Sequence, residues 1–516
     1  MKRFIQRFSD RVIGTLSGFD RVVIRGSLRA LSTNSGMREF LYQNGVLLKH
    51  FSGYSKRITA QLKEISQQIA ERKKRPFIYV PSSRTNKEEI ALKVLKKNPV
   101  KTGLICMLSC VEPCMGFEVV GYRDTKKIQM RKRERMCLHI YHYMIHPVFG
   151  FMNARIQTWF PFNIQFCING REWLSRQMDH RHMQYRRLDN CFSWVKNLSK
   201  AQELMNQQLE TNWPQILNPI VRTLNPFHDQ IFKRIPLQYY WCTSQTEWAT
   251  DVMFKDRSKL AQIYSAIIPH ALTSFSSPDV MRFLGRKLMP NYLGEVITDY
   301  KNRSEGIRIK HRVGKNSVKV YDKFNIVLRV ETTINNPRDF RVFRPLESHP
   351  DKMLAWQALR QGIADLHRRA EISQASNERY LDSLADIDPS LSMGRLLEKI
   401  SSPVIENGKR FRALRASDPT DLALFKAVTD GRFLINGFRN RDLQTMLFQK
   451  PPASEKEKRQ RTGRVSRLIR LLRAHHLVKR VSNTYRYLLT QRGAEILRSI
   501  LSMTHITLAQ LKQLAA

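Results

Sequence analysis

The fold is decided by the segment Ile307-Arg-Ile-Lys-His-Arg-Val-Gly-Lys-Asn-Ser-Val-Lys-Val-Tyr-Asp-Lys-Phe-Asn-Ile-Val-Leu-Arg-Val-Glu-Thr-Thr-Ile334. Two short turns, Gly314 to Asn316 and Phe324-Asn325, divide it into runs that each have the length of a strand. Glycine and asparagine are the residues that tight hairpins prefer. The segment therefore predicts three antiparallel strands over 307–313, 317–323 and 326–334.

Side chains on a strand alternate between its two faces. In the second and third strands this places four aliphatic residues on apolar faces: Val318, Val320, Leu328 and Val330. The same alternation puts a second set on the opposite, polar faces: Lys319, Tyr321, Lys323, Arg329 and Glu331. If the apolar faces align, a tyrosine, a carboxylate and several cations are displayed together.

These two strands resemble a strand pair of rolling-circle replication initiators of the plasmid and filamentous-phage type. The resemblance rests on Tyr321-Asp322-Lys323, a short turn, and Leu328-Arg329-Val330-Glu331, and it covers roughly residues 237–345. Val330 replaces the usual aromatic residue, and the family's His-hydrophobic-His metal motif is missing. The chain as a whole also resembles an uncharacterised family of bacterial proteins, and that likeness implies no activity.

The resemblance to initiators implies that DNA is nicked and rejoined through a phosphotyrosine, with Mg²⁺ or Mn²⁺. Tyr321 is the expected nucleophile, and Tyr380, in the predicted helix 377–382, is a rival. A free tyrosine titrates near 10, so nearby cations such as Lys323 and Arg329 are needed to favour the phenolate. Carboxylate oxygens suit a hard divalent ion. The candidate metal ligands are Glu331, Asp322, Glu247 and Asp251.

Glu247 and Asp251 belong to the aromatic, acid-bearing segment 239–251. They are four residues apart, so on a helix they would share a face and could hold a metal together. They could equally form ordinary surface pairs with Lys255.

The last hundred residues predict a winged helix-turn-helix domain over about 416–500. Asp418 caps a first helix that has Pro419 at its first position, as helix starts prefer. A second helix is expected in 436–448 and a third in 461–476, followed by a hairpin over 477–489 and a closing helix. This order of elements is that of a winged helix.

The predicted third helix of this domain carries arginines at a spacing of three, Arg464, Arg467, Arg470 and Arg473. An arginine stripe of this kind could lie in the major groove of DNA. The hairpin residues Lys479, Arg480 and Arg486 would then touch the DNA backbone. The alternative interpretation is that the stripe is a solvated face and the domain binds protein.

Composition points to the same class of partner. Lys and Arg number 88 against 44 Asp and Glu, which gives a formal net charge of +44. A folded chain with this surplus is typical of a protein that binds nucleic acid. The apolar stretches are too short to span a bilayer, and seven cysteines, an odd and sparse number, indicate reduced thiols. We expect a cytoplasmic, nucleoid-associated protein with DNA as partner and no membrane; a homodimer is one assembly compatible with this interpretation.

Residues 126–135 hold six basic residues, and aromatic residues follow at 141–162. A cationic strand beside aromatic rings could bind single-stranded nucleic acid by stacking the bases. Such rings can equally fill a core, because aromatic side chains dominate core burial. Both interpretations stay open at the level of sequence.

The expected fold class is α+β, multidomain, with central antiparallel sheets and a C-terminal winged helix. The expected domains are an N-terminal α/β domain at 1–102, a β-rich domain at 103–215, an initiator-like sheet domain at 216–345, a helical connector at 346–415 and the winged helix at 416–516. In the connector, Trp356, Leu359, Ile363 and Leu366 have helical spacing.

The expected function is that of a replication initiator or transposase of a mobile element or replicon, which nicks and joins DNA through a tyrosine. One alternative is a non-enzymatic winged-helix transcriptional regulator. A second alternative is a nuclease or transposase of the carboxylate-metal type.

Overall fold

The computed structural model describes residues 1–516 except 123–126, 287–294, 304–305, 347–348, 388–399, 407, 434–436, 449–450, 483 and 504–516. The described residues form an α+β protein of two compact units, and both units are discontinuous in sequence. The larger unit comprises Val12–Phe254 and Arg312–Glu378. The smaller unit comprises Met1–Arg11, Lys255–His311 and Arg379–Ala516.

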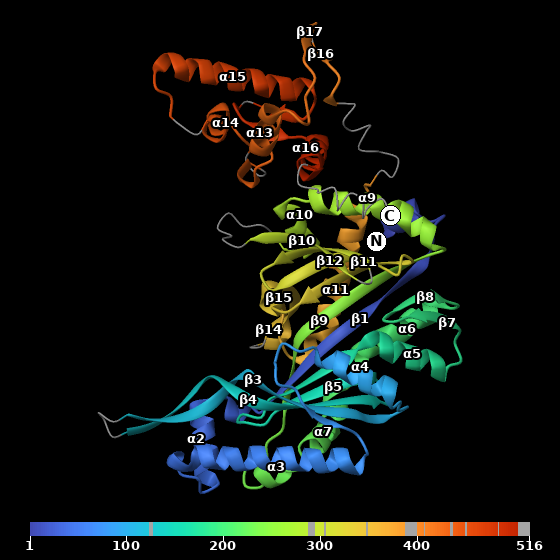
Figure 1. Ribbon diagram of the computed structural model, residues 1–516, viewed down its shortest axis with the longest axis vertical. Coiled ribbons are helices and arrows are strands. Elements are labelled where there is room, and N and C mark those ends of the chain that lie inside the picture. Colours follow the sequence, from blue (N-terminus) through green and yellow to red (C-terminus); the bar gives the residue numbers. More distant parts are fainter. Residues whose placement is uncertain are drawn as a thin grey trace. The chain divides into compact units, whose positions relative to one another are not determined.

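A long sheet forms the centre of the larger unit (Figure 1). The strands of this sheet that belong to the larger unit lie in the order β12 (Asn316–Lys323), β13 (Val327–Ile334), β9 (Tyr240–Phe254), β1 (Val12–Ser27), β6 (Ile164–Asn169), β5 (Gly150–Gln157), β4 (Lys127–His146), β3 (Gly103–Tyr122) and β2 (Phe77–Tyr79). Neighbouring strands are antiparallel except β2 and β3, which are parallel. Segments that the sequence assigned to three separate domains therefore each contribute strands to this sheet.

Helices and hairpins cover both faces of the sheet. The elements on one face around β4, β5 and β6 include α2 (Asn34–Gln43), α3 (Phe51–Arg72) and α7 (Trp213–Leu224). The opposite face carries α4 (Lys87–Lys97), which packs against β3 and β4. Further elements of this unit are α5 (Gly170–His180), β7 (Tyr185–Leu188), β8 (Cys191–Val195), α6 (Leu198–Gln207), β14 (Arg341–Leu346), β15 (His349–Ala358) and α11 (Leu366–Leu384, of which the residues from Arg379 on belong to the smaller unit).

Helix α11 binds the other end of the sheet through its buried polar side chains. Asn377 donates to the carbonyls of Trp248 (3.0 Å) and Val330 (3.2 Å), and its Oδ1 accepts from Thr332 at 2.7 Å. The predicted apolar residues Val318, Val320, Leu328 and Val330 are fully buried. The sheet face that bears the odd-numbered residues Tyr321, Arg329 and Glu331 is therefore the one that α11 does not cover.

The smaller unit contains α1 (Lys2–Arg7), α9 (Arg257–Thr273), α10 (Ser277–Phe283), β10 (Val296–Arg303), β11 (Gly306–Val313, of which the last two residues belong to the larger unit) and the winged helix. The winged helix consists of α13 (Pro419–Val428), α14 (Asn440–Leu447), α15 (Glu455–Ala474), β18 (Val478–Arg480), β19 (Tyr487–Leu489) and α16 (Gln491–Met503). Its buried apolar residues form a core of their own, which includes Leu424, Val465 and Leu497. A short hairpin, β16 (Val404–Glu406) and β17 (Lys409–Phe411), precedes it.

The order of elements confirms the predicted winged helix. Asp418 accepts hydrogen bonds from the amides of Thr420 and Asp421, as expected of the N-cap. The third helix begins six residues earlier than predicted, because Ser454 caps it through the amide of Glu457. The sequence prediction followed the apolar period, which begins only at Val465.

A further prediction about the fold was wrong. The spacing around Trp356 predicted a helix, but Trp356 lies in β15 with 67% of its surface exposed, opposite Phe343 of β14. Of the two interpretations left open for the aromatic residues at 141–162, the structure shows core packing for most of the rings, because the chain there folds into strands with covered faces. Those buried rings are Tyr141, Tyr143, Phe149, Trp159, Phe160 and Phe162. Among the described residues, no helix is long and apolar enough to cross a membrane.

Candidate carboxylate centre

Three carboxylates meet on the sheet face that α11 leaves uncovered. Asp20 on β1, Glu247 on β9 and Glu331 on β13 lie on neighbouring strands, and one ligand oxygen from each lies within 4.8 Å of the others. Asp20 occupies an irregularity in the β1–β9 pairing between Phe19 and Arg21. Bulges of this kind re-aim side chains. We call these three residues the carboxylate centre.

Tyr321 and Lys319 complete this centre from β12. In the β12–β13 register, Lys319 lies opposite Glu331 and Tyr321 lies opposite Arg329. The Tyr321 hydroxyl donates to Glu331 Oε2 at 2.7 Å, and Lys319 Nζ lies 2.6 Å from Glu331 Oε1. A hydroxyl, a carboxylate base and a cation that orients the base thus stand in a chain, which is the arrangement that activated nucleophiles need.

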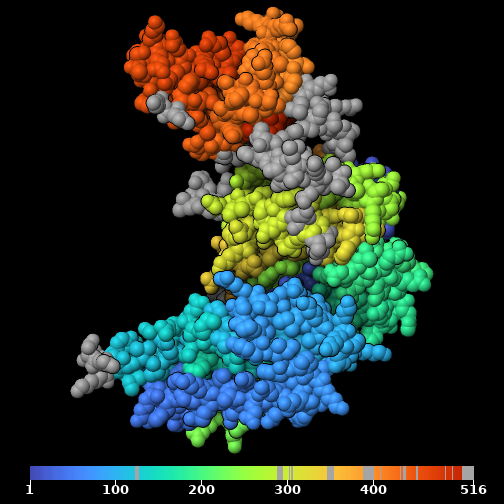
Figure 2. Space-filling model, viewed as in Figure 1, coloured from blue at the N-terminus to red at the C-terminus, as the bar shows by residue number. Residues whose placement is uncertain are grey.

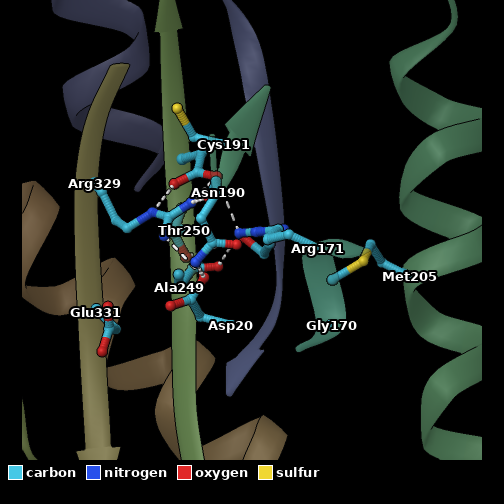
Figure 3. A network of polar contacts seen from close by, with 12 residues as sticks. Asp20, Gly170, Arg171, Asn190, Cys191, Met205, Ala249, Thr250, Arg329 and Glu331 are labelled. Carbon is cyan, nitrogen blue, oxygen red and sulfur yellow. Dashed lines mark hydrogen bonds and ion pairs between the residues drawn. The ribbon is translucent and has the colours of Figure 1, made fainter. Parts of the chain in front are cut away.

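A network of buried ion pairs lies beside the centre (Figure 3). Arg329 is fully buried, and its guanidinium contacts Asp251 (Nη2 to Oδ2, 2.9 Å) and Asp20 (Nη1 to Oδ1, 2.9 Å). Arg171 of α5, also fully buried, lies 3.1 Å from Asp251 Oδ2. Asn190, in the turn between β7 and β8, donates to Asp20 Oδ1 at 2.7 Å. Removing one partner from such a network leaves an uncompensated buried charge, so the network fixes the strands' positions.

The electrostatics distinguish the three carboxylates. Burial opposes the ionisation of Asp20, but Arg329 and Arg171 outweigh it and lower the pKa of Asp20. Burial and the charge of Glu331 raise the pKa of Glu247 to about 7. Among the described residues no ion pair reaches Glu247, whose Oε1 accepts from Gln245 Nε2 at 2.8 Å. Glu247 is therefore the carboxylate whose negative charge is least compensated.

The centre opens toward solvent at Glu247. Glu331 is fully buried, whereas Glu247 is half-buried and Lys319 retains 13% side-chain exposure. Arg21, opposite Glu247 in the β1–β9 register, is exposed. A ligand would thus approach the centre from the side of Glu247 and Arg21.

The donor set of the centre fits a divalent cation. The three groups are carboxylates, which hard cations such as Mg²⁺ and Mn²⁺ prefer. Burial, and then the neighbouring charge of Glu331, raise the pKa of Glu247, and a bound cation would favour the ionised form of this carboxylate.

The structure brings together most of the residues selected from the sequence. Tyr321, Arg329 and Glu331 share one face with Glu247 and Asp251, as their registers require. Glu247 and Asp251 lie on β9 and not on a helix; they share a face because an even spacing does so on a strand. Asp251 is held by the two arginines and is not one of the three carboxylates whose oxygens lie within 4.8 Å of one another.

Asp322 has a different position from the one expected. Asp322 pairs in register with Leu328, so it points to the face opposite Glu331 and does not join the carboxylate centre. Lys323 is buried, with its ammonium 3.8 Å from Asp189. Burial and the neighbouring Glu331 also raise the pKa of Tyr321 well above its usual value. The cations near Tyr321 thus do not make it a phenolate in this state of the protein.

The rival nucleophile Tyr380 lies in the smaller unit and is fully buried. Its hydroxyl lies 2.8 Å from His311 Nε2, and the rings of Phe275 and Phe283 pack around it. The carboxylate group able to hold a metal that is found among the described residues consists of Asp20, Glu247 and Glu331, and it lies in the larger unit. Tyr380 therefore fits a core residue.

The predicted DNA-binding arginines of the winged helix are all on its surface. Arg464, Arg467, Arg470 and Arg473 are exposed along one stripe of α15. Lys479 and Arg480 are exposed on β18, and Arg486 is half-buried beside β19. A hollow of about 550 Å³ lies between the start of α14, α15 and the hairpin, and Arg439, Arg441, Arg470, Arg473, Tyr485 and Tyr487 line it.

Asp20, Arg171 and Asn190 carry no signal in the sequence that marks them as members of the site. Asp20 stands at the start of an apolar run and resembles any strand-edge acid in the sequence. Asn190 accepts from Arg329, which is 139 residues away in the sequence, and Arg171 pairs with Asp251 of a distant strand. Nothing in a single sequence links residues so far apart.

Comparison of the chain with protein-family models, with curated proteins and with solved structures found no match.

Proposed function

We propose that this protein binds DNA through its winged helix and cuts a DNA strand at the carboxylate centre, as a replication initiator or transposase does. The observation that carries the proposal is the meeting of Asp20, Glu247 and Glu331 with their oxygens within 4.8 Å. Phosphodiester cleavage builds negative charge on phosphate oxygens and on the departing oxygen. Sites for it therefore gather cations around the phosphate.

A divalent cation, held by the three carboxylates of the centre, would polarise the phosphate and stabilise the departing oxygen. Lys319 stands next to the same position and supplies a positive charge from the protein itself. Arg329 and Arg171 hold Asp20 and Asp251 in place and so position the centre without contacting the phosphate.

Tyr321 is the proposed nucleophile, because its hydroxyl already donates to Glu331. In the proposed step the tyrosine oxygen forms a bond to phosphorus while one phosphate–sugar P–O bond breaks. Glu331 takes the tyrosine proton, and the departing sugar oxygen gains a proton from solvent. The products are a phosphotyrosine and a free DNA end, and rejoining reverses the same steps.

A second candidate is hydrolysis by water at the same carboxylates, without a covalent intermediate. Its support is the burial of Tyr321, of which 8% is exposed, and the raised pKa that burial produces. In that mechanism Tyr321 only orients Glu331. The third candidate is a non-enzymatic regulator. Its support is that ion pairs within the fold already offset the charges of Asp20, Asp251 and Glu331, as expected of carboxylates with a structural role.

One experiment separates the three candidates. The full chain is incubated with end-labelled single-stranded and duplex DNA in Mg²⁺ or Mn²⁺, and the products are separated under denaturing conditions. A covalent adduct that Tyr321→Phe abolishes and Tyr380→Phe keeps supports the tyrosine mechanism. Cleavage without an adduct, lost in Glu331→Gln, supports hydrolysis. Binding without cleavage in either metal contradicts both.

A matched control is Tyr42→Phe, because Tyr42 is 78% exposed and lies on α2, away from the centre. This variant is expected to leave the products unchanged. Loss of adduct in this variant as well would mean that Tyr321→Phe acted through general damage.

A further inference from the structure

A file of cationic side chains extends from the carboxylate centre along the same sheet face. Arg21 and Arg25 on β1 pair in register with Asn169 and Gln165 on β6. Gln165 in turn pairs with Arg155 on β5. Because directly paired residues lie on one face, Arg21, Arg25 and Arg155 all stand on the face of Glu247, to which Arg21 is opposite.

The middle of this file is hollowed. A cavity of about 210 Å³ is lined by Arg25 and Arg155 together with polar side chains of β5 and β6 and the base of β3. Arg25 is exposed, and Arg155 retains 32% side-chain exposure while it lies 3.2 Å from Glu112. The β3 residues that line this cavity are Pro113, Cys114 and Met115.

From these β3 residues the file continues onto a two-stranded arm. We define the arm as Pro113–Tyr122 of β3 and Lys127–Met136 of β4; Figure 2 shows it in cyan, projecting from the rest of the larger unit. Lys127, Arg131 and Arg133 alternate along β4, so they share one face of the arm. Arg131 and Arg133 are 46% and 57% exposed, and both pair with the single acid Glu118. That face therefore keeps a net positive charge.

The other face of the arm is committed to the core. Phe117 and Met130 are buried in the cluster that also holds Phe40 of α2, and Lys132 donates to the carbonyl of Ser32. Only the cationic face of the arm is therefore accessible to a ligand. Its basic residues are positioned by packing and are not a flexible tail.

We infer that this file, which we call the cationic track, binds the backbone of a single DNA strand and leads it to the carboxylate centre. The inference rests on the proposed function and adds the path of the substrate. Four strand spacings separate β9 from β4, roughly 19 Å, and residues 127 to 135 span about 26 Å. A track of about 45 Å suits a polyanion with regularly spaced charges. The cations stand in single file, so they would contact one backbone and not the two of a duplex.

The test measures binding of a fluorescein-labelled 30-nucleotide single-stranded DNA to the full chain by anisotropy, without divalent metal, over a range of salt concentrations. The track variant is Arg131→Glu/Arg133→Glu. We expect its affinity to fall by about tenfold or more, and its plot of log affinity against log salt to be shallower by about 1.4, which is two phosphate contacts at 0.7 each.

The matched control is Lys56→Glu/Lys63→Glu. Both lysines are exposed on α3, which covers the opposite sheet face, and the change in charge is the same. We expect this control to keep more than half of the wild-type affinity and the wild-type slope. A second track variant, Arg25→Glu, is expected to weaken binding as well, since Arg25 lines the hollow of the track.

Equal losses in the track and control variants would overturn the track, because general charge would then explain binding. Unchanged binding in Arg131→Glu/Arg133→Glu would overturn it too, and the proposed cleavage could still stand. Failure of the wild-type chain to bind either single-stranded or duplex DNA would instead overturn the proposed function itself. Circular dichroism spectra of all variants must match the wild type for these comparisons to count.

Discussion

At the scale of single residues, Glu247 is the group whose ionisation the fold opposes most clearly within the centre. Its pKa is raised to about 7 by burial and by Glu331, whereas an unfolded glutamate titrates near 4.3. Between these two pH values the folded protein holds a proton that the unfolded chain has lost. The free energy of unfolding therefore decreases as the pH rises from about 4.3 to about 7, by this group's contribution.

Glu247→Gln removes that charge and is expected to raise the free energy of unfolding at pH 8 by on the order of 2 kcal/mol. The gain should shrink toward pH 5, where wild-type Glu247 is already protonated. Chemical denaturation at both pH values, in EDTA, measures the effect. In wild type, Mn²⁺ should restore stability at pH 8; in the variant it should add much less. Equal stabilisation of both proteins by Mn²⁺ would contradict a metal site that includes Glu247.

His142 offers a second residue-scale test, on the acid side. It is buried in β4, neither ring nitrogen has a hydrogen-bond partner among the described residues, and burial lowers its pKa to about 4. Between about pH 6.5 and pH 4, His142 binds a proton in the unfolded chain but not in the folded protein. The free energy of unfolding therefore falls as the pH drops toward 4. Relative to wild type, His142→Phe should therefore gain about 2 kcal/mol in the free energy of unfolding at pH 5 from the removal of this titration. At pH 7.5 the removal of the titration should have little effect. Exposed His180 supplies the control, His180→Phe, which should leave the pH dependence as in wild type.

At the scale of elements, local patterns predicted what local physics controls. The strands at 317–323 and 326–334 appear at 316–323 and 327–334, because alternation and turn residues are encoded within a few positions. The turn between them places Phe324 and Asn325 at φ of 55° and 57°, as a tight hairpin of this type requires. Helix α4 begins directly after Asn86, whose side chain accepts from the amide of Glu88, and a short polar residue at this position is a local signal for a helix start. The predicted helix around Trp356 was wrong because Trp356 lies in an exposed hairpin. Burial does not constrain the spacing of apolar residues there, so their spacing does not report the secondary structure.

The attachment of α11 to the sheet depends on Asn377. Its side chain bonds two strands at once, through the carbonyls of Trp248 on β9 and Val330 on β13. Asn377→Ala leaves these buried groups without their partner, and we expect a loss of about 2 kcal/mol in the free energy of unfolding. Urea denaturation measures it. Glu371→Ala, at an exposed position of the same helix, should change stability by less than about 0.5 kcal/mol.

At the scale of the whole molecule, the sequence predicted the carboxylate centre only in part. Tyr321, Arg329 and Glu331 lie within a dozen residues, and alternation alone places them together. Asp20 joins them from the N-terminal segment, and Arg171 from a helix that begins at residue 170. These meetings depend on the order of strands in the sheet, which short-range periodicity does not encode. For the same reason, linear domain boundaries could not describe units that each draw on separate stretches of chain.

If the winged helix and the cationic track bind one DNA molecule, their contributions should add. The substrate for this test is a duplex with a single-stranded tail, and the variants are Arg467→Ala/Arg470→Ala, Arg131→Glu/Arg133→Glu and their combination in the full chain. Mutations at well separated sites usually add within about 0.5 kcal/mol. Titration in constant salt gives the three losses in binding free energy. A combined variant that binds no more weakly than the poorer double variant would mean that the two surfaces do not act on the same complex.

The wide separation of Asp20 and Glu331 along the chain has a consequence for synthesis. During translation Asp20 is incorporated early, and Glu331 is incorporated only after more than 300 further residues. A growing polypeptide consequently lacks the assembled trio for most of its translation. Whatever chemistry the finished molecule performs is withheld from the nascent one, and a premature stop before codon 331 yields a product without it.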